Sequence, residues 1–142
     1  MAKIVELRGM SVDKLEEMLE NAREEMFNLR FRNAASQLED YSRLKLVRRE
    51  MAQVKTVLNM RQLAQDTAAA QPEIASVLAG KEWQATSRFS YEDSAWQVEF
   101  VDSDGKDLAS ALVDLNKKRP YGRKAYRQKK QPQLVTSFEI AG

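Results

Sequence analysis

Two stretches in the first half of the chain repeat hydrophobic residues at the spacing of an amphipathic helix. In the first stretch the steps alternate between three and four positions: Val12, Leu15, Leu19, Ala22, Met26 and Leu29. The second stretch has the same steps: Leu44, Val47, Met51, Val54 and Leu58. Such steps keep side chains on one face of an α-helix. Because neither Gly nor Pro occurs between Ser11 and Leu38, we expect the first helix to be continuous, with Ser11 as its N-cap.

A short polar segment, residues 33–40, separates the two stretches. Helices joined by a short connection pack as antiparallel neighbours. We therefore predict a mainly α N-terminal unit over residues 1–65, a coiled-coil-like antiparallel two-helix hairpin with both apolar seams as its core. A hairpin buries only one stripe per helix, so this core is thin and needs support from a partner.

The two predicted helices differ in charge. Residues 11–29 carry two bases and six acids, a net charge of −4, whereas residues 41–61 carry six bases and one acid, a net charge of +5. Five residues of the second helix share one face, which we expect to lie opposite the seam: Lys45, Arg48, Ala52, Lys55 and Asn59. Either the basic helix pairs with the acidic one across the edges of the seam, or its outer face lies on phosphate. The expected position opposite the seam favours phosphate.

Phe27 and Phe31 lie one helical turn apart and off the seam. They favour contact with a partner, either a protein or an RNA minor groove. The alternative is that they wrap around the closed end of the hairpin, near Leu38 and Tyr41.

The period of the pattern changes in the second half of the chain. Residues 66–80 are predicted as a linker or a short helix that begins near Pro72. Alternation then predicts two strands, over residues 83–91 and 96–100, and a last strand over residues 134–140. Between them, Asp107 is expected to cap a short helix that carries Leu108, Leu112 and Leu115. Residues 81–142 thus form a small α+β extension.

Two local features of this extension carry candidate chemistry. Asp102, Asp104 and Gly105 resemble part of a calcium loop, but the later ligands are missing, so a β-turn over residues 103–106 is the better interpretation. Residues 117–130 form a basic arm with eight bases and no acid: Lys117, Lys118, Arg119, Arg123, Lys124, Arg127, Lys129 and Lys130. Tyr121 and Tyr126 are interleaved with them. Such arms order on RNA by neutralising phosphates, while a solvated loop that balances the acidic residues 66–114 is the alternative.

Composition excludes most catalytic chemistry. The 142 residues contain no Cys and no His, which removes thiolate nucleophiles, the usual neutral-pH general base and most transition-metal sites. We therefore expect no enzyme, no cofactor, no metal and no small-molecule substrate. The N-terminus has no signal-peptide core, and no apolar run reaches the roughly 20 residues of a membrane span, so we expect a soluble cytoplasmic protein without membrane contact.

Several motifs in the first half occur together in one known family. These are FNLRF at 27–31, QLE at 37–39, RL at 43–44, VRR at 47–49 and VKTVL at 54–58, after an opening LR at 7–8 and MSV at 10–12. In this order and without gaps, residues 1–62 resemble the bacterial-type family of the twenty-ninth protein of the large ribosomal subunit. The chain departs from that pattern at Ser36, where the family often has Gly, and at Asn33, where an apolar residue is commoner.

The resemblance implies a structural constituent of the large ribosomal subunit. It implies a two-helix hairpin that binds large-subunit rRNA near the polypeptide exit tunnel, beside the twenty-third large-subunit protein. At positions matching the family's motifs, the candidate rRNA contacts are Arg30, Arg43, Arg48, Arg49 and Lys55, and the charge pattern adds Lys45 and the basic arm. The alternative function is a coiled-coil protein-interaction module with a basic nucleic-acid-binding tail.

Overall fold

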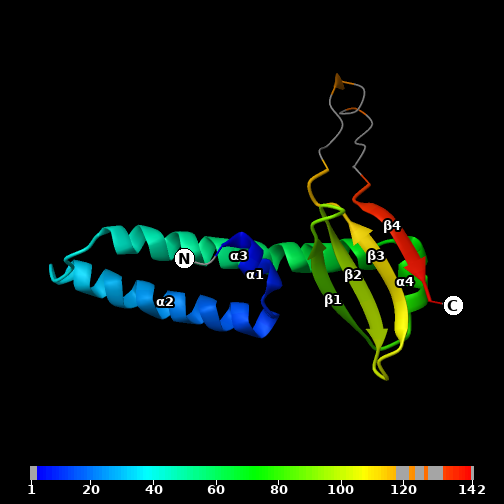
Figure 1. Ribbon diagram of the computed structural model, residues 1–142, viewed down its shortest axis with the longest axis horizontal. Helices are drawn as coiled ribbons and strands as arrows, with labels where there is room; N and C mark the ends of the chain where they lie inside the picture. Colours follow the sequence, from blue (N-terminus) through cyan, green and yellow to red (C-terminus); the bar gives the residue numbers. More distant parts are fainter. Residues whose placement is uncertain (1–2, 118–121, 124–126, 128–132, 142) are drawn as a thin grey trace. The chain divides into compact units, whose positions relative to one another are not determined.

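A computed structural model describes residues 3–117, 122–123, 127 and 133–141 (Figure 1). The chain divides into two compact units, Met1–Met60 and Arg61–Gly142. The first unit contains α1 (Ile4–Gly9), α2 (Val12–Ala34) and most of α3 (Ser42–Ala69), and the unit boundary falls inside α3. The second contains α4 (Pro72–Leu78) and the strands β1 (Trp83–Ser90), β2 (Ala95–Asp102), β3 (Asp107–Val113) and β4 (Val135–Ile140). The structure thus has a helical N-terminal region followed by a small sheet-bearing extension, which agrees in outline with the predicted fold class.

The predicted seams form the core between α2 and α3, which run antiparallel (Figure 1). Leu15 near the start of α2 packs in one cluster with Val54 in the middle of α3, while Met26 further along α2 packs in one cluster with Val47, which is nearer the start of α3. The Ser11 hydroxyl accepts a hydrogen bond from the Lys14 amide at 3.3 Å, which confirms the predicted N-cap. Most of the predicted seam is buried or half-buried, although its first member, Val12, is exposed.

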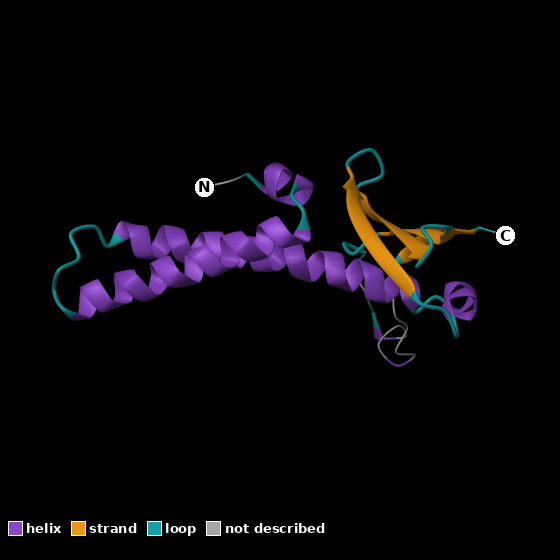
Figure 2. Ribbon diagram, turned by 90° about the horizontal axis from the view of Figure 1, so that it is seen from below, coloured by secondary structure: helices purple, strands orange, loops and turns teal. Residues whose placement is uncertain are grey.

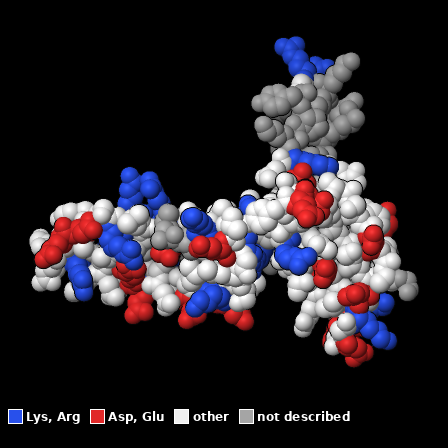
Figure 3. Space-filling model, viewed as in Figure 1, with Lys and Arg blue, Asp and Glu red and all other residues white. Residues whose placement is uncertain are grey.

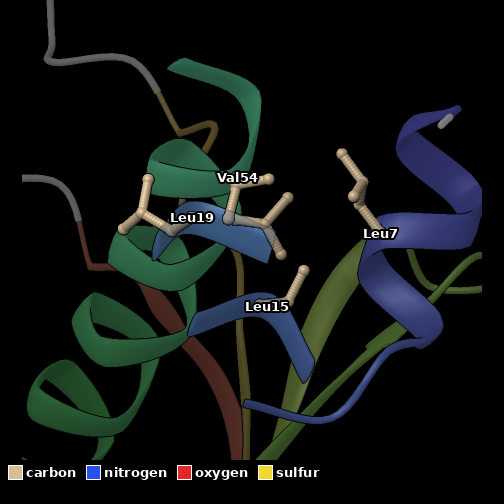
Figure 4. Packing of buried hydrophobic residues seen from close by; sticks show 5 residues of the cluster. Leu7, Leu15, Leu19 and Val54 are labelled. Atoms are coloured by element: carbon tan, nitrogen blue, oxygen red, sulfur yellow. The ribbon is translucent and has the colours of Figure 1, made fainter. Parts of the chain in front are cut away.

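The short helix α1 was not expected from the sequence. Its Leu7 is fully buried and packs in one cluster with Leu15, Leu19 and Val54 (Figure 4). The same cluster includes Val57, which lies outside the predicted seam of α3. A second helix covering that side of α3 explains why Val57 is buried, so α1 widens a core that two helices alone would leave narrow.

The connection between α2 and α3 contains Ser36, where the family that the sequence resembles often has Gly. This residue adopts a left-handed backbone conformation with φ of 56°, which a glycine would take without steric cost. The following residues lead to Asp40, whose carboxylate accepts hydrogen bonds from the hydroxyl of Ser42 at 2.5 Å and from its amide at 2.9 Å. These bonds at the start of α3 lower the pKa of Asp40, with that to the Ser42 hydroxyl contributing most.

The second unit contains an antiparallel sheet in the order β1-β2-β3-β4, with helices on one of its faces (Figure 2). Trp96, Val98 and Phe100 of β2 are fully buried. Two edge-on ring contacts link β2 to β1: the ring centroids of Trp96 and Phe89 are 5.3 Å apart, and those of Phe100 and Trp83 are 5.4 Å apart. The strands predicted at 83–91, 96–100 and 134–140 are confirmed, with small differences in their bounds.

The helix predicted to begin at Asp107 is wrong, because residues 107–113 form β3. Ala109, Ala111 and Val113 of β3 are buried opposite the large side chains of β2, and a bulge opposite Phe100 and Val101 breaks the alternation near Leu108. The pairing with β2 and β4 overrides the helix-like spacing of Leu108, Leu112 and Leu115.

Of two smaller predictions for the second unit, one is confirmed and the other is shifted by one residue. α4 begins with Pro72 in its first turn, and Ile74 and Leu78 are buried. A β-turn is present one residue earlier than predicted, because the Gly105 amide donates to the carbonyl of Asp102 at 2.9 Å and so closes residues 102–105. Among the described residues, no helix has the length and apolar content to cross a membrane.

Candidate nucleic-acid interface

A shallow groove runs between α2 and α3 on one flank of the hairpin. Four basic and four apolar residues line it: Arg23, Met26, Phe27, Arg30, Arg48, Met51, Ala52 and Lys55. Helix geometry explains the composition, because Arg23, Phe27 and Arg30 recur along one side of α2, as do Arg48 and Lys55 along α3. The groove therefore has cations on both rims.

The floor of the groove is apolar. Met26 is buried in the hairpin core, whereas Phe27 exposes 69% of its surface. An exposed aromatic ring between guanidinium and ammonium groups offers a surface on which a base or sugar can pack while phosphates meet the cations. Acidic and basic side chains are interspersed over the hairpin surface (Figure 3), so the local arrangement matters more than the total charge.

The basic face of α3 does not lie opposite the seam, as the sequence pattern led us to expect. Arg48, Ala52 and Lys55 line the groove together with residues of α2. Each follows a seam residue by one position, and one position corresponds to a rotation of about 100° around the helix. This face therefore flanks the seam and borders α2.

Arg43 lies on a different side of α3 and interacts with the acidic helix. Its Nε and Nη2 donate to the two carboxylate oxygens of Glu25 at 2.5 and 2.9 Å. The hydrogen bonds and the charge of Glu25 raise the pKa of the Arg43 guanidinium. Among the described residues, Arg48 and Lys55 make no ion pair. Both alternatives drawn from the charge pattern therefore occur on α3: Arg43 pairs with the acidic helix, whereas Arg48 and Lys55 keep their cations available to a partner.

The remaining predicted contacts of the hairpin are exposed. Arg30 lies on the rim of the groove, and Lys45 and Arg49 expose their side chains on α3. Phe31 is 68% exposed but does not line the groove. Leu38 packs against the core cluster at the closed end, which contains neither phenylalanine.

The basic arm is described only in part. Lys117, Arg123 and Arg127 are exposed. Five predicted contacts lie outside the described residues, as do both tyrosines of the arm: Lys118, Arg119, Lys124, Lys129 and Lys130. The Asp114 amide donates to the Leu134 carbonyl at 2.9 Å, so the segments on either side of the arm are held together at the sheet.

Sequence reasoning did not select Arg23, which lines the groove and forms an ion pair with Glu20. The signal was present in the spacing of Arg23, Phe27 and Arg30 at positions i, i+4 and i+7. The net negative charge of α2 drew attention away from these two arginines, which lie on the same side of the helix.

The fold and this surface together define a class, a small helical-hairpin protein with a cation-lined groove on one flank. The family model described as Ribosomal L29 protein matches residues 5–61. A protein of Thermobifida fusca (strain YX) is 53% identical over 58 residues, which cover 41% of this chain and 68% of the relative. Proteins of Staphylococcus aureus (strain N315) and Staphylococcus carnosus (strain TM300) are 39% identical over 66 residues, which cover 46% of this chain and 96% of each relative. All three bear the name large ribosomal subunit protein uL29.

The chain belongs to the Ribosomal L29 protein family. Proteins of this family are of a structural, non-enzyme kind. The family model ends at residue 61, where the second unit begins. The family assignment therefore rests on the hairpin, and the sheet-bearing extension lies outside it.

Proposed function

We propose that this chain is a structural constituent of the large subunit of cytoplasmic ribosomes and binds large-subunit rRNA through the groove of its hairpin. The observation that carries the proposal is the groove itself, with Arg30, Arg48 and Lys55 around the exposed ring of Phe27. Cations that replace condensed counterions on phosphates supply affinity without sequence specificity. A protein that holds folded rRNA in shape needs this kind of contact.

The individual basic residues contribute unequally in this proposal. Arg48 and Lys55 have no ion-pair partner among the described residues, so phosphate neutralises them without breaking an internal contact. Lys45 and Arg49 extend the contact along α3. Arg43 is already paired with Glu25, so it contributes less to phosphate binding than its position in the family motif implies.

The position that we propose on the ribosome is the one that the family resemblance implies. We place the hairpin near the polypeptide exit tunnel, beside the twenty-third large-subunit protein. Phe31, which is exposed and outside the groove, is the proposed contact to that neighbouring protein. A photoreactive amino acid at position 31 should crosslink to the neighbouring protein in assembled subunits, while one at the exposed position Thr56 serves as the control. Crosslinks from position 31 to rRNA alone would contradict the proposed protein contact.

The basic arm adds a second rRNA contact. Its eight bases over residues 117–130 release counterions on binding, and Tyr121 and Tyr126 supply rings for stacking on unpaired bases. We expect trypsin to cleave the arm in the free chain and to cleave it much more slowly in assembled subunits. Equal cleavage in both states would favour a solvated loop, and protection in the free chain would favour pairing with the acidic residues 66–114.

The groove is tested by removing its unpaired cations. Arg48→Ala with Lys55→Ala should weaken binding to large-subunit rRNA and lower the log–log slope of affinity against salt by about 0.9 for each lost phosphate contact on a duplex scale. The matched control is Lys14→Ala with Arg32→Ala, which removes the same charge from exposed positions outside the groove. Helix content should stay unchanged in both double variants, because none of the four residues is buried.

Two results would contradict the groove assignment. One is a salt slope that the groove variant leaves unchanged. The other is an equal loss of slope in the control, which would mean that overall charge rather than the groove determines binding.

A further inference from the structure

The two edge strands of the sheet in the second unit, β1 and β4, differ in whether another element of the chain covers them. At β1, the side chain of Gln65 in α3 donates to the Ala85 carbonyl and to the Ser87 hydroxyl, both at 3.3 Å. The Ser87 hydroxyl in turn donates to the carbonyl of Arg61 at 3.5 Å. The end of α3 thus covers the β1 edge, as proteins commonly do to prevent further strand pairing. At β4, no strand among the described residues pairs with the outer side.

The backbone of β4 presents hydrogen-bonding groups on that outer side. The Ala141 amide donates to the carbonyl of Leu108, so it faces β3. Residues of an antiparallel strand alternate between facing their partner and facing away. In the regular register between residues 109–111 and 138–140, the amide and carbonyl groups of Phe138 and Ile140 therefore face away from β3.

The two faces of the sheet beside this edge differ in chemistry. Phe138 and Ile140 pair in register with Ala111 and Ala109, on the face that carries the buried core of β2, and expose 37% and 41% of their surface. On the opposite face, Glu139 pairs in register with Ser110, which pairs with Glu99, so two carboxylates stand in one row across three strands. A pocket on this face has a third carboxylate, that of Asp107, in its lining.

We propose that β4 accepts an extended segment of another protein in which basic and apolar residues alternate, and which pairs as a fifth strand. Main-chain hydrogen bonds to Phe138 and Ile140 hold such a segment in register. Because side chains of a strand alternate between faces, every second residue meets the apolar side chains of Phe138 and Ile140. The residues between them face the side chain of Glu139, where Lys or Arg supplies the complementary charge, and Glu99, two strands beyond β4, adds to the negative charge of the same face.

The charges at this edge argue against two other occupants. A second copy of β4 would bring another Glu139 and no base, because Val135–Ile140 contains no Lys or Arg. RNA would bring phosphates against the carboxylates of Glu139, Glu99 and Asp107. A basic extended segment is the occupant whose charge complements this surface.

The probe is a short synthetic peptide of alternating Val and Lys, added to the full chain. We expect binding, together with slower amide hydrogen exchange at Phe138 and Ile140, measured by NMR. A twin peptide of alternating Val and Glu should bind at least about tenfold more weakly, because its acids face the carboxylates. Equal binding of both peptides, or no added protection at these two amides, would overturn the proposal.

Three variants localise the contact. Ile140→Pro removes an outward amide that β3 does not use and should abolish the protection at Phe138, since proline is tolerated on the open side of an edge strand. Glu139→Lys should remove the preference for the Lys peptide, whereas Glu92→Lys, the same charge change in the β1–β2 turn, should preserve it. If Glu92→Lys removes the preference as well, overall charge explains the binding and the proposal fails. Protection of the two amides that rises with protein concentration without any peptide would assign the edge to a second copy instead and would also overturn it.

Discussion

The hairpin and the sheet-bearing unit obtain their cores in different ways. The hairpin buries small and medium aliphatic side chains along two helices and uses Leu7 of α1 to cover one end. The sheet-bearing unit buries Trp96 and Phe100, the two largest fully buried side chains of the described residues. A layer with large aromatic rings removes more apolar area from water than a single aliphatic stripe. We therefore expect the hairpin to depend on an external surface more than the sheet-bearing unit does.

The two units also differ in the partner that their charges suit. The hairpin groove has cations on both rims around an exposed phenylalanine ring, whereas the open edge of the sheet has carboxylates beside it. One surface complements phosphate and the other complements a basic protein segment. The arm of the second unit carries the opposite charge to the acidic residues 66–114 that precede it, so we expect this unit to meet two kinds of partner.

The largest expected effect comes from a charge in the thinner core. Val47 is fully buried in the cluster at the closed end of the hairpin. Val47→Asp should destabilise the hairpin by about 5 kcal/mol, because it removes apolar burial and places a carboxylate without a partner in the core. Amide hydrogen exchange of the full chain should show lost protection in α2 and the first half of α3, with β2 still protected.

The matched control is Leu46→Asp, at the neighbouring and exposed position. It should cost less than about 1 kcal/mol, as surface substitutions commonly do. If Val47→Asp also removed protection from β2, the two units would not be separable, and the comparison between them would fail.

The second effect tests the aromatic core in the same way. Phe100→Ala should destabilise the sheet by about 4 kcal/mol through lost burial and a cavity next to Trp83 and Val98. The near-ultraviolet circular dichroism of Trp83 and Trp96 should weaken while the far-ultraviolet helix signal largely persists. A matched control is Phe138→Ala, on the exposed edge strand, where a much smaller loss is expected. Similar losses for both variants would mean that burial in β2 does not dominate the stability of this unit.

Much of the fold could be predicted because the local patterns agree with the tertiary structure. The steps of three and four residues identified α2 and α3, and the alternation around Trp96 and Phe100 identified β2. Ser11 could be identified as the start of α2 because its hydroxyl accepts a hydrogen bond from a residue only three positions further along the chain. Contacts between residues close in sequence are the ones that a sequence pattern predicts best. The basic arm was visible as a charge run, but its contacts depend on a partner.

The remaining features depend on contacts between distant residues. α1 has only one buried residue, Leu7, so its sequence shows no period. β3 contains Ala and Leu at helix-like spacing, and only its pairing with β2 and β4 makes it a strand. The groove combines residues of two helices, and the pattern along α3 alone placed its basic face on the wrong side. The covered and open edges of the sheet have no signature in the strand sequences at all.

The smallest expected effect compares one substitution in both units. Each unit has a serine with positive φ in a tight connection, Ser36 at 56° and Ser94 at 50°. An L-residue in this conformation costs about 1–2 kcal/mol, and glycine removes that cost but adds about 0.5–1 kcal/mol of unfolded-state entropy. Ser36→Gly and Ser94→Gly should therefore each stabilise their own unit by about 0.5 kcal/mol, detected as slower hydrogen exchange confined to that unit. Ser76→Gly, inside α4, should destabilise by about 1 kcal/mol because no strain is relieved there. Stabilisation that spread from one unit to the other would show that the hairpin and the sheet unfold together, and would replace the contrast between two cores with a single cooperative fold.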